Sequence, residues 1–238
     1  TLGALSMADI PLYRQVYAPL LLDPVFAPSP DFGNRQPGEN EADCALRCAD
    51  ALEAHLAEHA ATTAALIVEP LVQGAAGMAM YPPVYLSRAR ELCTKYRVHL
   101  IADEIAVGFG RTGTMFACEQ AGIRPDFICL SKGITGGYLP LSAVLTTADV
   151  YAAFYGDATA RGFLHSHSYT GNPLACRAAL AVLDIFEHDD VIAANRVRAV
   201  EFTRMLAEVA AHPRVRHFRH LGMIWAFDVA DATSGFSA

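Results

Sequence analysis

Two residues of complementary chemistry stand at the ends of apolar segments, 29 positions apart in the chain. Asp103 ends V-H-L-I-A-D (98–103), and Lys132 follows F-I-C-L-S (127–131). A partly desolvated lysine is a competent amine for attack on a carbonyl carbon. A carboxylate can keep a heterocyclic nitrogen protonated, and a pyridoxal enzyme needs both groups. The pair is compatible with that chemistry, although its spacing alone does not specify it.

Asp103 on its own has other interpretations. Together with Glu104 it could bind magnesium in a nucleotide hydrolase or switch, although the phosphate loop G-x-x-x-x-G-K-[ST] is absent from the sequence. It could also cap a helix or lie on the surface. A nucleotide-binding ATPase or switch is therefore the alternative from a different functional class.

The segments that must position these residues alternate between apolar strands and helices. We predict helices over 41–59, 83–97, 115–120, 174–188 and 191–211, and strands over 64–68, 98–102, 127–130, 141–145 and 221–229. Most of the strands are apolar on both faces, which favours an α/β fold with a mostly parallel central sheet covered by helices. In such sheets ligands bind beyond the carboxyl ends of the strands, where Glu69, Asp103 and Lys132 are expected.

Composition excludes several functions. The net charge of −7 and the absence of a basic block argue against nucleic-acid binding. No apolar run reaches 18 residues, so no membrane span is expected. The six cysteines form no C-x-x-C pair, and we interpret them as small buried residues of a cytoplasmic protein in a reducing compartment.

Four longer segments resemble the class III aminotransferases, which depend on pyridoxal 5'-phosphate and have fold type I. They are V-E-P-L-V-Q-G-A-A-G-M (68–78), L-I-A-D-E-I-A-V-G-F-G-R-T-G (100–113), L-S-K-G-I-T-G-G (130–137) and H-S-H-S-Y-T-G-N-P-L-A (165–175). The resemblance covers roughly residues 1–229. It implies a cofactor-binding large domain over 1–188, lacking its N-terminal part, and the truncated start of a smaller C-terminal domain over 189–238.

The resemblance also implies roles around the cofactor ring. Lys132 would bind the cofactor aldehyde and shuttle the proton between substrate and cofactor. Asp103 would pair with the pyridine nitrogen. Ile105 would pack on the ring face, and Gln73 would lie near the ring hydroxyl. Ile105 could instead be a plain core residue.

Further roles concern the phosphate and the substrate. The resemblance places His167 and Ser168 at the cofactor phosphate, across the interface of a homodimer with shared active sites. Ser166 would line the substrate pocket, where Lys132 also acts, and Glu69 would neutralise a substrate-binding arginine. Glu69 could instead cap the turn before Pro70. His165 and His167 look like half a metal site, but further ligands at suitable spacing are missing, so no metal is expected.

Within the family, one subgroup of biotin biosynthesis resembles this sequence best. The shared features are M-A-M-Y (78–81) after the first segment and D-E-I-A (103–106). That subgroup transfers an amino group from S-adenosylmethionine to 8-amino-7-oxononanoate and makes 7,8-diaminononanoate. The alternative is a class III transaminase for an ω-amino acid or diamine, with pyruvate or 2-oxoglutarate. Ser168 departs from the threonine of some members but keeps the hydroxyl, and His167 replaces a proline found in others.

The family's other phosphate-binding residues and its late substrate arginine are expected outside residues 1–238. We therefore expect this stretch, expressed alone, to bind the cofactor weakly and to catalyse no transamination. Apolar surface should also be exposed where the remaining segments pack.

Overall fold

A four-stranded sheet organises the computed structural model, which describes residues 2–230. The strand order is β1-β4-β5-β6, with β1 (Ala65–Val68), β4 (His99–Asp103), β5 (Phe127–Leu130) and β6 (Ala143–Thr146). The pairs β1–β4 and β4–β5 are parallel, whereas β6 runs antiparallel to β5. The prediction of a mostly parallel α/β sheet is thus confirmed, with one antiparallel edge strand.

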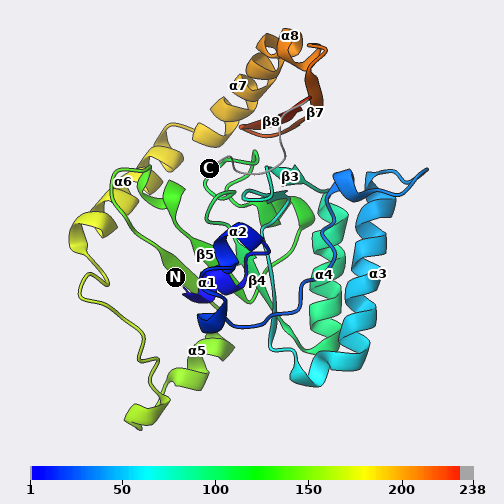
Figure 1. The fold of residues 1–238 in the computed structure, drawn as a ribbon. Coiled ribbons are helices and arrows are strands. Elements are labelled where there is room, and N and C mark those ends of the chain that lie inside the picture. Colours follow the sequence, from blue (N-terminus) through cyan, green and yellow to red (C-terminus); the bar gives the residue numbers. More distant parts are fainter. Residues whose placement is uncertain (1, 231–238) are drawn as a thin grey trace.

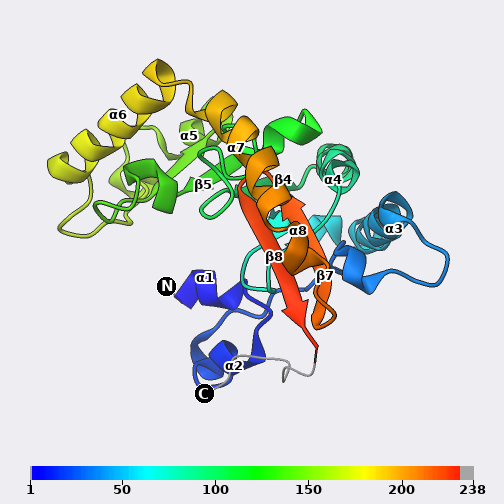
Figure 2. The same cartoon turned by 90° about the horizontal axis from the view of Figure 1, so that it is seen from above.

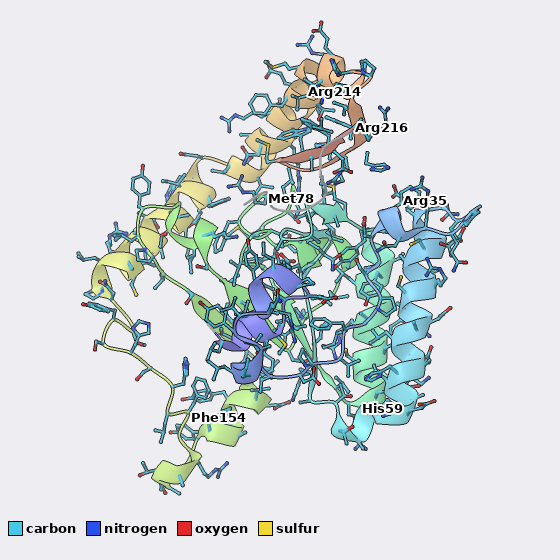
Figure 3. All side chains as sticks on the ribbon, in the orientation of Figure 1. Arg35, His59, Met78, Phe154, Arg214 and Arg216 are labelled. Atoms are coloured by element: carbon cyan, nitrogen blue, oxygen red, sulfur yellow. The ribbon has the colours of Figure 1, made fainter. Side chains whose placement is uncertain are left out.

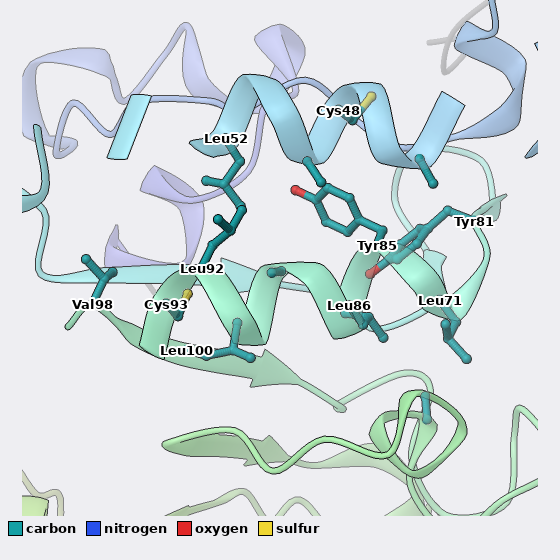
Figure 4. Close-up of a cluster of buried hydrophobic side chains, with 14 of the residues drawn as sticks. Cys48, Leu52, Leu71, Tyr81, Tyr85, Leu86, Leu92, Cys93, Val98 and Leu100 are labelled. Carbon is teal, nitrogen blue, oxygen red and sulfur yellow. The ribbon is translucent and has the colours of Figure 1, made fainter. Parts of the chain in front are cut away.

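Two long helices lie on one side of this sheet (Figure 1). They are α3 (Glu41–His59) and α4 (Pro83–Tyr96), and α4 lies between α3 and the sheet (Figure 4). Asn40 begins α3 with a capping box shared with Asp43, which satisfies backbone donors at both residues. Proline at the first position starts α4, and Arg97 ends it in the left-handed conformation.

The main hydrophobic core fills the space between α3, α4 and the strands (Figure 4). Leu86, Leu92 and Leu100 are completely buried there, and Tyr81 and Tyr85 meet edge to face at 5.5 Å. A smaller cluster around Phe109, Leu130, Ile134 and Ala179 forms on the side of α6 (Pro173–His188). The strand that ends at Asp103 and the strand that precedes Lys132 are therefore held by packed side chains.

The C-terminal part forms a separate projection above the sheet (Figures 1 and 2). It consists of α7 (Val191–Met205), α8 (Ala207–Ala210) and the antiparallel hairpin of β7 (Val215–Leu221) and β8 (Ile224–Val229). The strand predicted over 221–229 is observed as β8, but it begins only at Ile224, because Leu221 ends β7 and the chain turns at Gly222, whose φ is +57°. The preceding strand β7 was not predicted. The predicted helix over 191–211 is interrupted at Leu206.

Short elements complete the described chain. The helices α1 (Leu2–Ser6), α2 (Pro11–Arg14) and α5 (Ala148–Phe154) and the strands β2 (Val72–Gln73) and β3 (Ala79–Met80) were not predicted. The 3-10 helices are η1 (Ala18–Leu20), η2 (Phe32–Asn34), η3 (Ala60–Thr62), η4 (Ala117–Ala121), η5 (Lys132–Thr135) and η6 (Thr159–Arg161). Within residues 2–230, no helix is both long and apolar enough to cross a membrane. The six cysteines are free.

Candidate active site

The carboxyl ends of β1, β4 and β5 bring three charged residues to one edge of the sheet. Glu69 follows β1, Asp103 ends β4, and Lys132 comes two residues after β5. Because the three strands are parallel and adjacent, their ends face the same side. The three residues therefore lie at the same edge of the sheet, as the sequence predicts.

Asp103 is half-buried and is oriented by its own loop. Its Oδ1 accepts a hydrogen bond from the backbone N–H of Ile105 at 3.0 Å. Ile105 itself is half-buried beside it. This bond fixes the direction of the carboxylate at the strand end. A carboxylate that accepts a hydrogen bond from a ligand must be oriented in this way.

Glu104, the neighbouring acid, has a structural role. Its side chain is fully buried, and its two oxygens accept hydrogen bonds from the N–H groups of Ala117 and Cys118, at 2.9 and 2.8 Å. It therefore caps η4 from the β4 loop. Burial raises the pKa of its carboxyl, although the two backbone hydrogen bonds oppose that effect. Because both Glu104 oxygens are occupied, the Asp103–Glu104 pair does not form a two-carboxylate magnesium site.

Lys132 opens η5 in an unusual backbone conformation, with φ of +44°. Its side chain is exposed, while Ile134 and Thr135 behind it are buried. Gly133 lies so close to Phe109 that an added Cβ would come within 2.8 Å of the Phe109 Cβ. A non-glycine residue at positive φ costs energy that the surroundings must offset, and such residues concentrate at functional sites. The turn is thus packed from behind and presents the lysine amine outward.

Glu69 and Gln73 are held by groups from other segments. The N–H of Gly74 donates to Glu69 Oε1 at 3.1 Å, and the Tyr81 hydroxyl donates to the Glu69 carbonyl at 2.6 Å. Burial raises the pKa of Glu69, and the Asp103 charge adds to the rise. The Ser29 hydroxyl bonds Gln73 Oε1. Ser29 was not predicted, and no sequence pattern around it indicates this contact.

The remaining predicted residues, Ser166, His167 and Ser168, lie in an exposed loop that arcs away from the sheet between η6 and α6 (Figure 1). The hydrogen bonds of His167 stay within the loop: its N–H donates to the Thr170 hydroxyl at 3.0 Å, and its Nδ1 accepts from the Tyr169 N–H at 3.1 Å. The chain alone therefore does not bring this loop to Asp103 and Lys132. Across residues 2–230, no cluster of three metal-ligand side chains occurs.

Comparison with known proteins agrees with this geometry. The model of the family Aminotransferase class-III matches residues 1–235. The chain belongs to the class III aminotransferases. It is 45% identical to the adenosylmethionine-8-amino-7-oxononanoate aminotransferase of Nitratidesulfovibrio vulgaris, over 97% of this chain and 43% of that protein. The chain spans about half the length of the curated relatives it matches.

Solved structures of class III aminotransferases share the fold. The adenosylmethionine-8-amino-7-oxononanoate aminotransferase of Methanocaldococcus jannaschii superposes with a TM-score of 0.86 at 34% identity, covering 97% of this chain and 51% of that one. An (S)-enantioselective omega-transaminase from Thermomicrobium roseum gives a TM-score of 0.86 at 31% identity, covering 96% of this chain and 51% of that one. The fold is therefore shared by an adenosylmethionine-8-amino-7-oxononanoate aminotransferase and by an omega-transaminase.

The described residues fit the cofactor of class III aminotransferases, pyridoxal 5'-phosphate. The cofactor carries an aldehyde and a basic ring nitrogen, which need an amine and an acid. Lys132 presents an exposed amine, and Asp103 presents an oriented carboxylate at the neighbouring strand end. The chemistry of this donor set matches both groups.

Proposed function

We propose that this chain carries the reacting lysine and the ring-nitrogen acid of a pyridoxal phosphate-dependent aminotransferase. The reaction is transfer of an amino group from S-adenosylmethionine to 8-amino-7-oxononanoate, a step of biotin biosynthesis. The observation that carries the mechanism is the placement of Asp103 and Lys132 at adjacent parallel strand ends. The names of the relatives from N. vulgaris and M. jannaschii support the choice of substrates.

We infer the roles around the cofactor from the family resemblance and from the chemistry of each side chain. Pyridoxal phosphate, when bound, supplies an electrophilic carbon and a ring that accepts electrons from the substrate. Lys132 Nζ would hold the cofactor at that carbon and would carry the proton removed from the substrate. Asp103 would keep the proton on the ring nitrogen. Ile105 would pack on the ring face, and Gln73, which is bonded by the Ser29 hydroxyl, would lie beside the ring hydroxyl.

Substrate binding involves Glu69, Ser166 and again Lys132. The Glu69 carboxyl is half-buried after the end of β1 and would pair with a cationic side chain that reaches the site. We assign residues 1–188 to the large domain and 189–238 to the start of the small domain, since the projection of α7, α8, β7 and β8 begins at Val191.

We further propose a homodimer with shared sites in the cytoplasm. The loop with Ser166, His167 and Ser168 is exposed, and its aromatic and aliphatic neighbours are exposed too, with Leu164 at 81% and Tyr169 at 75%. Exposed apolar side chains of this extent are typical of interfaces. Ser168 and His167 would then reach the cofactor phosphate of the partner subunit.

Chemical labelling of the full-length enzyme tests the lysine assignment. Borohydride reduction followed by peptide mapping should place the pyridoxyl group on Lys132. Lys95 is the other lysine of the sequence and serves as the internal control, because it forms an ion pair with Glu53 at 2.6 Å. Label on Lys95 would refute the assignment. In the same enzyme, Asp103→Asn should lower turnover at least ~10³-fold, about 4 kcal/mol of barrier.

A donor screen separates the leading function from the second candidate, an ω-amino acid or diamine transaminase. That candidate is favoured by the equally close superposition of the T. roseum omega-transaminase. We expect amino transfer from S-adenosylmethionine to 8-amino-7-oxononanoate. Efficient transfer from alanine or ornithine, with none from S-adenosylmethionine, would select the second candidate.

Complementation tests the shared sites. Full-length Lys132→Ala and Ser168→Ala variants should each be inactive as homodimers. If Ser168 acts across the interface, a mixed dimer contains one site with both lesions and one with neither, so activity should partly return. Mixed dimers shown to form but to remain inactive would argue against this role.

A further inference from the structure

Arg219 of β7 joins the C-terminal hairpin to a loop of the candidate site. Its Nε donates to the carbonyl of Met78 at 2.9 Å, and its Nη2 donates to the carbonyl of Gly77. On the hairpin side, Nη1 donates to the His217 carbonyl at 2.8 Å, and Nη2 meets Asp228 Oδ1 at 3.3 Å. Only 22% of the Arg219 side chain is exposed, so the guanidinium is enclosed between the two segments.

The loop that Arg219 contacts connects β2 to β3 and carries site residues at its base. Gln73 ends β2, and Gly74 donates the hydrogen bond to Glu69. Met78 closes the loop with an N–H bond to the Gly74 carbonyl at 3.1 Å, and its φ is +58°. A methionine in this conformation is strained and needs support from its surroundings. Arg219 binds the carbonyls of Met78 itself and of the preceding Gly77.

The hairpin also contacts the loop that follows Asp103. The N–H of Met223 donates to the Arg111 carbonyl at 2.7 Å, and Arg196 of α7 donates to the Gly113 carbonyl at 2.9 Å. The approach is close enough that a Cβ on Gly222 would meet the Thr112 carbonyl carbon at 2.3 Å. The C-terminal projection therefore binds backbone carbonyls of two loops, one beyond Gln73 and one beyond Asp103.

Arg219 differs from its neighbours on the same segment in this respect. Figure 3 labels Met78 below the hairpin and Arg214 and Arg216 at the outer end of the projection. Arg216 also lies on β7, but its Nη1 bonds only nearby carbonyls, those of Pro213 and of Val215. Two arginines of one strand thus differ in whether they reach the site loop.

We propose that Arg219 is a positioning residue of the active site. By holding the carbonyls of Gly77 and Met78, it fixes the 74–78 loop and therefore the places of Gln73 and Glu69. Through this contact, a shift of the C-terminal projection would move the 74–78 loop and with it the site residues. The effect on cofactor and substrate rests on the function proposed above, whereas the restraint on the loop does not.

The test compares Arg219→Ala, Arg219→Lys and the control Arg216→Ala in the full-length holoenzyme. Hydrogen exchange of backbone amides in residues 72–80 should be at least about tenfold faster in Arg219→Ala and unchanged in Arg216→Ala, while exchange in α3 and α4 stays at the wild-type rate. The dissociation constant for pyridoxal phosphate and the KM for substrate should rise several-fold, with a smaller change in kcat. Lysine can bond one of the two carbonyls, so Arg219→Lys should be intermediate.

Two results would overturn the proposal. One is equal exchange of residues 72–80 in Arg219→Ala and Arg216→Ala. The other is faster exchange throughout α3, α4 and the loop together, which would make Arg219 a general stabilising residue without a specific role at the site. If the wild-type enzyme fails to bind pyridoxal phosphate at Lys132, the proposed function fails, and the exchange comparison still decides the role of Arg219.

Discussion

The two sides of the sheet differ in how completely their apolar side chains are buried. On the side of α3 and α4, Leu86 and Leu92 are fully buried. On the side of α5 and α6, Leu164 is 81% and Leu174 71% exposed. The first side is a fully packed core. It fixes the orientation of β1 and β4 and therefore the positions of Glu69 and Asp103, which stand at the ends of these strands. The second side carries Ser166, His167 and Ser168 on a segment whose apolar side chains are uncovered, and in the proposed homodimer this surface would meet the second subunit.

The largest expected effect on stability is that of a core truncation on the covered side. Leu92→Ala should lower the free energy of unfolding by about 3 kcal/mol, because it removes buried methyl groups and leaves a cavity. The matched change Leu164→Ala on the uncovered side should alter subunit unfolding by less than about 0.5 kcal/mol and weaken dimerisation instead. Urea unfolding at several protein concentrations measures both. Similar losses of subunit stability in the two variants would remove the contrast between the sides.

The buried Glu104 carboxylate tests whether polar contacts also stabilise the covered side. Glu104→Gln should cost about 2 kcal/mol, because the amide can accept from one of the Ala117 and Cys118 N–H groups and turns a donor toward the other. Glu119→Gln is the control: its exposed side chain accepts a single backbone hydrogen bond, from Phe116, which glutamine can keep. The unfolding midpoints of the two variants measure this difference in stability. Equal midpoints would show that the Glu104 cap contributes little to the free energy of unfolding.

The sequence predicts the placement of the central site residues well. Short apolar segments ending in Glu69, Asp103 and Lys132 indicate strand ends, and the helical spacing before His59 predicts α3 at its observed bounds. These features depend on local pattern and on general rules for parallel sheets. The predicted separation of the two domains and the roles of the individual site residues stay predictions.

Other features depend on contacts between distant segments and leave no local pattern. The strand β7 has the sequence V-R-H-F-R-H-L, and its charged and polar residues obscure the apolar pattern by which a strand is predicted. A bulge also falls between Arg216 and Arg219. The reversal of β6 relative to β5 cannot be seen in an apolar run. The contacts of Ser29 with Gln73 and of Arg219 with Met78 join residues 44 and 141 positions apart. Such pairs are fixed by the tertiary fold, so single-sequence reasoning misses them.

The smallest expected effect concerns Glu69, at the boundary between the packed core and the open site. Burial raises the pKa of its carboxyl, with a further contribution from Asp103. An acid whose pKa is higher in the folded than in the unfolded state binds its proton more tightly when folded, so its ionisation at rising pH costs stability. Glutamine cannot ionise, and its oxygen can keep the bond from the Gly74 N–H.

Glu69→Gln should therefore gain stability relative to the wild type as pH rises. The gain should be absent below the ordinary glutamate pKa, grow as pH rises toward the raised pKa of the folded state, and then level off at about 1 kcal/mol or less, because the group is only half-buried. Urea midpoints from pH 4 to pH 8 measure it, with the exposed Glu201→Gln as the control. A difference that is independent of pH would mean that folding leaves the pKa of Glu69 unchanged. A difference of the opposite sign would mean that the folded state stabilises the ionised carboxylate, as the cationic side chain proposed to pair with Glu69 would do.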